Sequence, residues 1–203
     1  MTELDSGIRG QIDSHALDQI FRDARTHRSW IPAPLDEALL REIYRLARLG
    51  PTSANCCPAR FVFVTTDQGK ARLLPVLAEG NREKSRTAAA VAIIAYDVEF
   101  YEQLPKLAPY ADVRSTSVGH EALIQETAFR NSSLQGAYFI IAARALGVDC
   151  GPMSGFDAEK MNAEFFPDGK WKANFVCNLG RGDGSKLFPR QPRLEFEEAC
   201  RVV

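Results

Sequence analysis

A helix end, a polar turn and a buried strand are joined in Gly50-Pro51-Thr52-Ser53-Ala54-Asn55-Cys56-Cys57-Pro58-Ala59-Arg60-Phe61-Val62-Phe63-Val64. Gly and Pro end the amphipathic helix that precedes this stretch, and the β-branched and aromatic run at its end predicts a strand. The hydroxyl and amide groups between them fit a ligand-binding turn. They also fit a turn that Thr52, Ser53 and Asn55 merely cap, so other motifs must decide.

Hydrophobic periodicity places further helices and strands around this turn. It predicts helices over residues 15–26, 35–49, 68–77 and 121–146, with Asp157 as the N-cap of a short helix to Phe165. It predicts strands over residues 61–66, 88–96 and 171–179, and turns over residues 151–156 and 180–184. Helices and strands alternate irregularly, which indicates a single α+β domain over residues 1–203 rather than a repeat.

The second half of the longest predicted helix, residues 136–147, is apolar nearly all round. Such a helix must be covered on most sides. Either the centre of the core or a second subunit can supply the cover, and we prefer the second subunit. The sequence therefore favours a homodimer.

Charge and cysteine content limit the class of protein. The chain has 25 basic and 26 acidic residues and a formal charge of −1, which favours a small-molecule ligand over nucleic acid or a membrane surface. Five cysteines without a CxxC pair indicate reduced thiols. The first 18 residues carry charges and no continuous apolar run, so we expect no signal peptide, no transmembrane segment and a cytoplasmic location.

Several familiar catalytic motifs are absent. The chain has no GxGxxG, GxxxxGK[ST] or GxSxG, and none of its three histidines pairs with another at metal-ligand spacing, so no metal site is expected. Asn131-Ser132-Ser133 matches a glycosylation sequon inside a predicted helix, which favours chance. Cys56 and Cys57 have no local histidine, and structural packing is the better interpretation than a nucleophile.

Five scattered clusters share one chemistry, because they combine cations and hydroxyls for a phosphate with amides for a planar heterocycle. They are Arg25-Thr26 with Arg28, Ser53 with Asn55, Asn81 with Lys84, Gly155, and Arg190 with Arg193. Each has a structural alternative, since basic residues also complement helix ends and tail arginines are usually solvated. Together they indicate recognition of one ligand.

The sequence resembles the FMN-dependent nitroreductase-like family from about Leu17 to Cys200. The family's R-x-S-x-R motif is similar to residues 25–28, its P-S-S-x-N-x-Q-P-W-R-F loop to residues 51–61, and its N-x-x-K element to residues 81–84. The strings G-P-T-S-A-N-C, E-T-A-F-R-N-S-S, G-P-M-S-G-F-D and P-R-L-x-F-E-E-A resemble the malonic semialdehyde reductase branch linked to pyrimidine degradation. Cys57 stands where many relatives carry Gln, and Ser154 stands where some carry Glu. The family's closing basic-x-R element is similar to the segment from Arg190 to Arg193, where Arg190 is one residue off the usual spacing.

This resemblance implies a nitroreductase-like three-layer α/β/α sandwich with a mainly antiparallel mixed sheet, a homodimer with FMN at the subunit interface, and NADH or NADPH as electron donor. It implies cofactor-binding roles for the following residues: Arg25, Thr26, Arg28, Ser53, Asn55, Asn81, Lys84, Ser154, Gly155, Arg190 and Arg193. Arg25, Thr26 and Arg193 suit the phosphate, and Arg28 and Lys84 suit the N1/O2 side of the ring. The backbone of Gly155 would lie near N5, which carries the hydride.

The resemblance implies reduction of malonic semialdehyde to 3-hydroxypropanoate by two half reactions through the flavin. Arg114 and Arg130 are candidates to bind the substrate carboxylate, from their places in the matching strings. No side chain stands out as the proton donor. Two alternatives remain: a broad reductase of nitroaromatics or quinones, and a flavin-binding protein without turnover.

Overall fold

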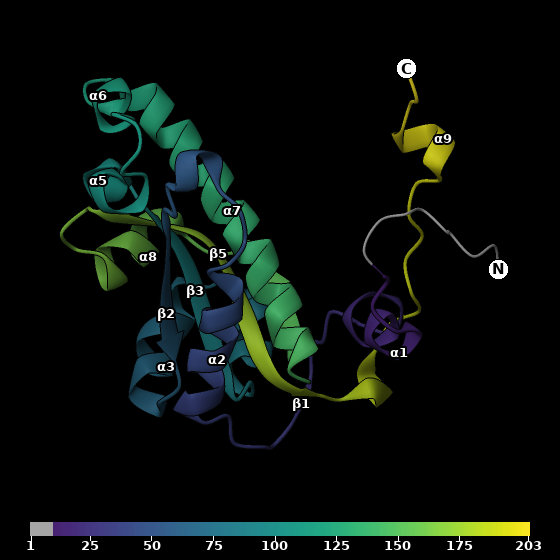
Figure 1. Cartoon of the computed structure of the whole chain (residues 1–203). Helices are drawn as coiled ribbons and strands as arrows, with labels where there is room; N and C mark the ends of the chain where they lie inside the picture. The colour runs from purple at the N-terminus through teal and green to yellow at the C-terminus, as the bar shows by residue number, and fades with distance from the viewer. Residues whose placement is uncertain (1–9) are drawn as a thin grey trace.

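A five-stranded antiparallel sheet with helices on both faces forms the centre of the computed structural model, which describes residues 10–203 (Figure 1). The strands are β1 Trp30–Ile31, β2 Ala59–Val64, β3 Ala90–Asp97, β4 Asp149–Met153 and β5 Trp171–Gly182. Their order is β1-β5-β3-β2, with β4 also paired to β5, and every strand pair is antiparallel. The predicted α+β class and mainly antiparallel sheet are confirmed, but the sheet is not mixed: the parallel pairing found among the described residues is the isolated bridge between Thr26 and Cys150.

The central strand β3 explains the three layers. Every residue of β3 is buried, and successive side chains of a strand point to opposite faces. Ala92 and Ile94 pack in a core with α2 (Glu37–Ala47) and α7 (Glu121–Ala145), while Val91 and Ile93 pack in a second core with α3 (Asp67–Leu73) and α8 (Ala158–Phe165). A strand that is apolar at every position needs cover on both faces, which these helices supply.

The helix ends follow local sequence signals. The Asp36 carboxylate accepts from the Leu39 amide at 2.7 Å and starts α2, and the predicted N-cap Asp157 accepts from the Lys160 amide at 3.1 Å and starts α8. The remaining elements are α1 Ser14–Leu17, η1 Asp18–Arg22, η2 Ser53–Asn55, η3 Leu74–Val76, α4 Glu79–Arg86, η4 Phe100–Gln103, α5 Leu104–Leu107, α6 Arg114–Ser117, η5 Gly184–Lys186 and α9 Phe196–Ala199.

Two predicted helices are wrong in extent. The helix over residues 15–26 ends at Arg22, and its last part, η1, is a π-helix. Beyond it, residues 23–28 have no regular structure except a bridge between Thr26 and Cys150. The helix over residues 68–77 stops at Leu73 and continues as the short η3, because Pro75 has no amide hydrogen for an α-helical bond.

Two predicted turns are partly strands. Gly151–Met153 belongs to β4, and β5 runs through Gly180 to Gly182 instead of turning there. Pairing between β4 and β5 supplies hydrogen-bond partners for the backbone N–H and C=O groups of these residues, although their glycine and proline content is typical of a turn. Pro152 is tolerated because, apart from the isolated Thr26–Cys150 bridge, β4 pairs only with β5 among the described residues, and an edge strand need not donate every amide.

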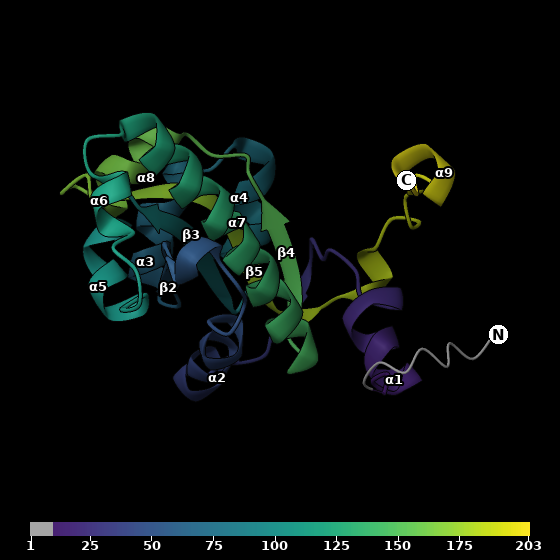
Figure 2. The same ribbon diagram turned by 45° about the horizontal axis from the view of Figure 1, so that its top comes forward.

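The N-terminal helices and residues 187–203, here called the tail, lie beside the end of the sheet (Figure 2). The last residues of the tail extend away from the sheet with α9. The first nine residues of the segment expected to lack a signal peptide fall outside the described part. Between residues 10 and 203, no helix combines the length and hydropathy needed to cross a membrane.

Candidate functional site

A cavity of about 760 Å³ lies where residues 21–28, α4, β4 and the tail meet. Its lining contains a hydroxyl from Thr26 and six cationic side chains, from Arg25, Arg28, Lys84, Arg144, Arg190 and Arg193. Six of the predicted cofactor-binding residues are thus brought together from three distant parts of the chain. Arg144 was not predicted, because it lies near the end of a helix whose neighbours are apolar.

None of these six cations forms an ion pair with a carboxylate of residues 10–203. Four of them contact backbone carbonyls instead. Arg25 donates to Phe188 O, Arg190 donates to Arg22 O at 2.6 Å, and Arg144 donates to Ile20 O at 3.2 Å. Carbonyl dipoles offset these charges only in part, so the cavity suits an anion, and guanidinium groups suit phosphate in particular.

The tail forms one wall of the cavity. The Arg28 guanidinium carbon lies 4.5 Å from the centre of the Phe188 ring, a cation–π distance. The bonds from Arg25 to Phe188 O and from Arg190 to Ala24 O, the latter 3.1 Å, connect the same two segments. Residues near both ends of the chain therefore build one site.

Lys84 enters the cavity from α4. Partial burial lowers the pKa of its ammonium, and the positive charge of Arg28 lowers it further. The Lys84 carbonyl accepts from the Trp30 indole at 2.7 Å, which ties α4 to the segment that carries Arg28. Two neighbouring cations that pair with no carboxylate of residues 10–203 suit an anionic ligand.

Asn81 and Gly155 meet next to this cavity. The Asn81 amide donates to Gly155 O at 2.7 Å, and the backbone amide of Ala78 donates to the same oxygen at 3.0 Å. A Cβ on Gly155 would lie 2.6 Å from Asn81 Nδ2, so the contact requires glycine. Ser154 is exposed beside it. Two further predicted clusters are therefore adjacent in space, and the Asn81 neighbour Gly80 lines the cavity.

The loop with Ser53 and Asn55 does not line this cavity. The Ser53 amide donates to Asn131 Oδ1 on α7 at 2.8 Å, and the Asn55 side chain donates to Leu107 O on α5 at 2.7 Å. Ala54, Asn55 and Cys57 have positive φ values of 49°, 53° and 41°. Three non-glycine residues in the left-handed region indicate a loop held in one shape at an energetic cost.

The two predicted substrate arginines lie apart from the cavity. Arg114 on α6 pairs with Glu102 at 2.7 Å, and the guanidinium lowers the pKa of that carboxyl. Arg130 on α7 pairs with Glu126 one turn away. Each arginine would have to leave its glutamate before it could bind a substrate carboxylate.

Cys56 is buried in the same loop, and burial raises the pKa of its thiol to about 11. A thiol with so high a pKa stays protonated near neutral pH and is a poor nucleophile. This supports the structural interpretation of Cys56.

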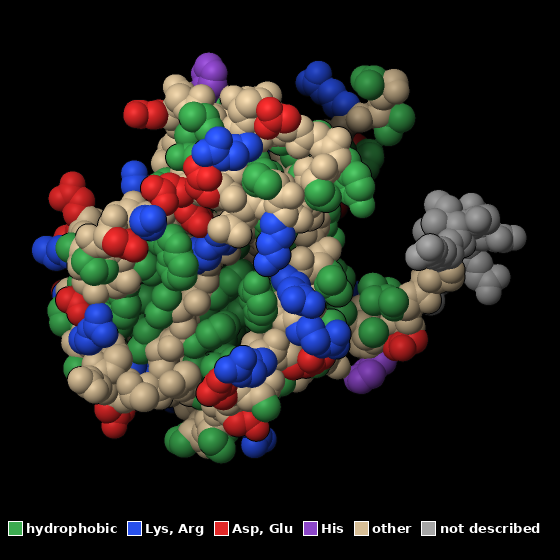
Figure 3. Space-filling view, turned by 60° about the vertical axis from the view of Figure 1, so that its left-hand side comes forward, with side chains coloured by type: hydrophobic (Ala, Val, Ile, Leu, Met, Phe, Trp, Pro, Cys, Tyr) green, Lys and Arg blue, Asp and Glu red, His purple; other side chains and the backbone are tan. Residues whose placement is uncertain are grey.

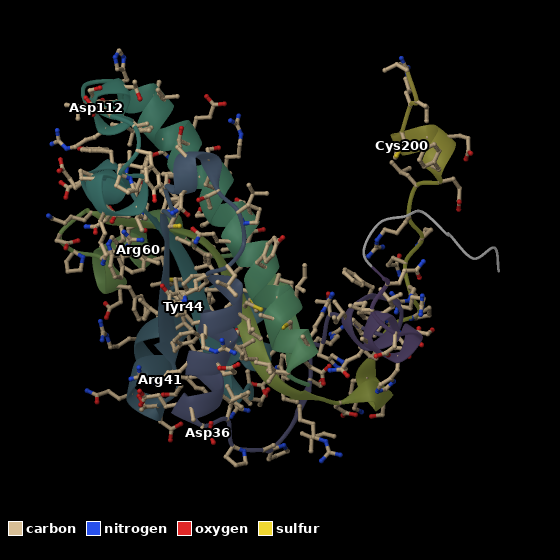
Figure 4. All side chains as sticks on the ribbon, in the orientation of Figure 1. Asp36, Arg41, Tyr44, Arg60, Asp112 and Cys200 are labelled. Carbon is tan, nitrogen blue, oxygen red and sulfur yellow. The ribbon has the colours of Figure 1, made fainter. Side chains whose placement is uncertain are left out.

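We therefore expect iodoacetamide at neutral pH to label Cys56 far more slowly than Cys200. Cys200 is an exposed internal control that follows α9, away from the sheet (Figure 4). Peptide mass spectrometry over a time course measures both rates in one sample. Labelling of Cys56 as fast as Cys200 would contradict the burial and pKa of this thiol.

Comparison with known proteins identifies the family. The sequence profile of the nitroreductase family matches residues 21–181. A protein of Ralstonia nicotianae, described as a candidate NADH dehydrogenase/NAD(P)H nitroreductase, is 57% identical over 192 residues, which are 95% of this chain and 98% of that protein. A similarly described protein of Rhodopseudomonas palustris is 56% identical over 191 residues, 94% and 97% of the two chains.

Solved structures agree at the level of the fold. The crystal structure of the candidate nitroreductase ydfN of Bacillus subtilis has a TM-score of 0.83 at 21% identity and covers 94% of this chain and 100% of that one. A candidate nitroreductase of Exiguobacterium sibiricum, crystallised in complex with FMN, has a TM-score of 0.82 at 19% identity, with coverage of 95% and 99%. The sequence match and the shared fold lead to one conclusion: the chain belongs to the nitroreductase family.

Proposed function

We propose that this protein is an FMN-dependent NAD(P)H oxidoreductase that reduces malonic semialdehyde to 3-hydroxypropanoate in pyrimidine degradation. The observation that carries the flavin part is the cavity with six cations and no carboxylate partner among the described residues. The relatives' NAD(P)H nitroreductase names and the FMN bound to the Exiguobacterium protein support it. The aldehyde rests on the resemblance of the four sequence strings. The reduced thiols and the use of NAD(P)H favour the cytoplasm.

The chemistry of the cavity fits FMN. Arg25 and Arg193 would hold the phosphate by charge-assisted hydrogen bonds, with the Thr26 hydroxyl and Arg190 completing its surroundings. Arg28 and Lys84 would lie beside the N1/O2 side of the ring. Asn81 would contact the polar edge of the ring, and Gly155 with Ser154 would leave room for its face. These are the roles that the resemblance to the nitroreductase-like family implies.

When bound, FMN supplies a ring atom that accepts hydride from NAD(P)H and returns it to a carbonyl carbon. The side chains do the rest by position and charge. Lys84 and Arg28 would place positive charge beside the ring, which would favour its reduced form and raise its reduction potential. Gly155 keeps the space over the ring free of a side chain. Water would donate the proton to the developing alkoxide, and a backbone amide could stabilise the oxygen by a hydrogen bond.

A second copy of the chain belongs to the same proposal. Ser53 and Asn55 reach the flavin only if the loop of another subunit approaches the cavity. On α7 the large apolar side chains Leu123, Phe129, Leu134 and Tyr138 are each 40 to 49% exposed, an apolar surface that a partner would cover. Light scattering after size exclusion tests this, and a monomer at all concentrations would contradict it.

The open edge of the sheet offers a further surface for that partner. A groove of about 1010 Å³ runs between α2 and β2, and its lining includes Tyr44, Phe61 and Phe63. Figure 3 shows hydrophobic side chains in a hollow on this side of the molecule. Arg41 and Arg60 flank the groove (Figure 4). The homodimer proposal predicts that a second subunit covers part of this groove.

Turnover experiments separate the proposal from its alternatives. Stopped-flow reduction of the flavin by NADH and NADPH tests electron transfer, and a flavin that neither reduces would leave only a flavin-binding protein. Steady-state rates with malonic semialdehyde and with a nitroaromatic then compare the two substrates. Negligible aldehyde turnover beside fast nitro reduction would establish the broader reductase, which the names of the relatives favour.

Lys84 gives a pH prediction. Burial holds the pKa of Lys84 below the usual lysine value in the free protein, and a bound anion favours the charged ammonium, so binding takes up a proton. FMN affinity should therefore fall as the pH rises toward the usual lysine pKa of about 10.4. Lys84→Arg keeps its charge over this range and should flatten the profile. Titrations of both proteins across this range measure the effect, and identical profiles would contradict it.

A further inference from the structure

His27 is a buried histidine in the middle of the cationic segment, residues 25–28. Its side chain is only 8% exposed. Its Nε2 lies 3.3 Å from Asp149 Oδ1, and its backbone amide donates to Cys150 O at 3.0 Å. The other oxygen of Asp149 accepts from the Gly182 amide at 2.8 Å. One carboxylate at the start of β4 therefore connects the imidazole to the end of β5.

Two glycines make room for this histidine. A Cβ on Gly182 would lie 2.0 Å from His27 Nδ1, and a Cβ on Gly151 would lie 2.7 Å from the His27 carbonyl oxygen. Neither glycine has a positive φ, so the close approach rather than the backbone conformation requires glycine here. Both strands thus leave a space that His27 fills.

The cationic segment depends on such contacts because it has little regular structure of its own. Only Thr26 forms a backbone bridge, and its partner is Cys150, the residue that also accepts the His27 amide. His27 is the only side chain of the segment that is buried; Arg25 and Thr26 on one side and Arg28 on the other face the cavity. Fixing the imidazole therefore fixes the backbone from which these residues extend.

The two ring nitrogens of His27 have different surroundings. His27 Nδ1 is buried and has no partner among residues 10–203, whereas Nε2 has Asp149. An unsatisfied buried nitrogen is costly, and a leucine of similar size would fill the same space without that cost. The contact of Nε2 with Asp149 Oδ1, at 3.3 Å, is therefore the interaction that a leucine would lose.

We propose that His27 and Asp149 are positioning residues for phosphate binding: the contact between their side chains holds Arg25 and Thr26 at the angle from which they contact the phosphate of the flavin. This inference rests on the proposed FMN site and adds that one pair of residues within it serves phosphate binding. The pair acts mainly on the phosphate end of the ligand, because two residues of the segment, Arg25 and Thr26, are assigned to the phosphate and only Arg28 to the ring.

Two ligands that differ only in the phosphate test whether the pair serves the phosphate or the ring. FMN and riboflavin are each titrated against the flavin-free full-length protein, with flavin fluorescence as the readout. His27→Leu should raise the FMN Kd roughly tenfold and the riboflavin Kd by less than about twofold. His27→Gln, which can place an amide N–H near Asp149, should restore FMN affinity to within about twofold of the parent protein. A general loss of structure would weaken both ligands and would not be rescued.

A second variant provides an independent route. Asp149→Ala should weaken FMN binding to a similar degree, and the double variant should be no worse than either single one, because both changes remove the same contact. Circular dichroism and thermal melts accompany each titration. Equal FMN affinity in the parent and His27→Leu, or a parallel loss of riboflavin, would overturn the inference. A parent protein that binds no FMN would instead refute the proposed function.

Discussion

Replacing Arg25 with alanine is expected to raise the Kd for FMN roughly tenfold to a hundredfold. A charge-assisted hydrogen bond contributes about 1.5–3 kcal/mol, and every 1.4 kcal/mol corresponds to about tenfold in affinity. Arg25 lines the cavity and has no carboxylate partner among the described residues, so its charge is available to a phosphate. The change also removes the bond from Arg25 to Phe188 O, which holds the tail against the cavity.

Fluorescence titration of the flavin-free variant measures this loss, and the choice of control makes it specific. Arg72→Ala removes an exposed arginine that pairs with Glu164 outside the cavity, so its FMN affinity should match that of the parent. An unchanged Kd in Arg25→Ala would refute the phosphate role of Arg25. An equal loss in both variants would point to overall charge rather than to a contact.

Phe139→Ala is expected to cost about 3–5 kcal/mol of the free energy of unfolding, the usual range for removing a buried aromatic ring. Phe139 is fully buried in α7, and its ring centre lies 5.2 Å from that of Phe61 and 6.0 Å from that of Phe63. Its loss leaves a cavity between the longest helix and the sheet. The rings of β2 lose their packing partner at the same time.

Urea unfolding followed by circular dichroism measures the change. Tyr110→Ala serves as the control, since Tyr110 is 98% exposed and exposed substitutions change stability by about 0.5 kcal/mol or less. A loss below about 1 kcal/mol in Phe139→Ala would mean that the site collapses without a cavity.

The fold was predictable where hydrophobic pattern alone determines structure. The apolar run of β3 and the long pattern of α7 gave the correct elements within about two residues at each end. The pattern failed where a tertiary partner decides. Gly151–Met153 looks like a turn from its composition, yet pairing with β5 makes it a strand. Residues 23–28 lie in no helix because contacts with β4 replace helical bonds.

The sequence predicted which types of side chain form the candidate site, but it predicted only in part which of them lie together. Arg25, Lys84 and Arg193 lie far apart in sequence, and the resemblance grouped them before the cavity did. His27 was missed although it stands inside the same motif, because burial of a single histidine has no sequence signature. Whether Ser53 and Asn55 join the site depends on a second chain, which hydrophobic periodicity cannot place.

The tail forms one wall of the cavity, and this has a consequence for truncated chains. Every strand of the sheet is complete by Gly182, but Phe188, Arg190 and Arg193 are added later. A chain that stops between these points keeps the whole sheet and lacks two of the six cations. Truncation there would separate the sheet from the proposed flavin site: the strands would still pair, and the flavin would bind more weakly.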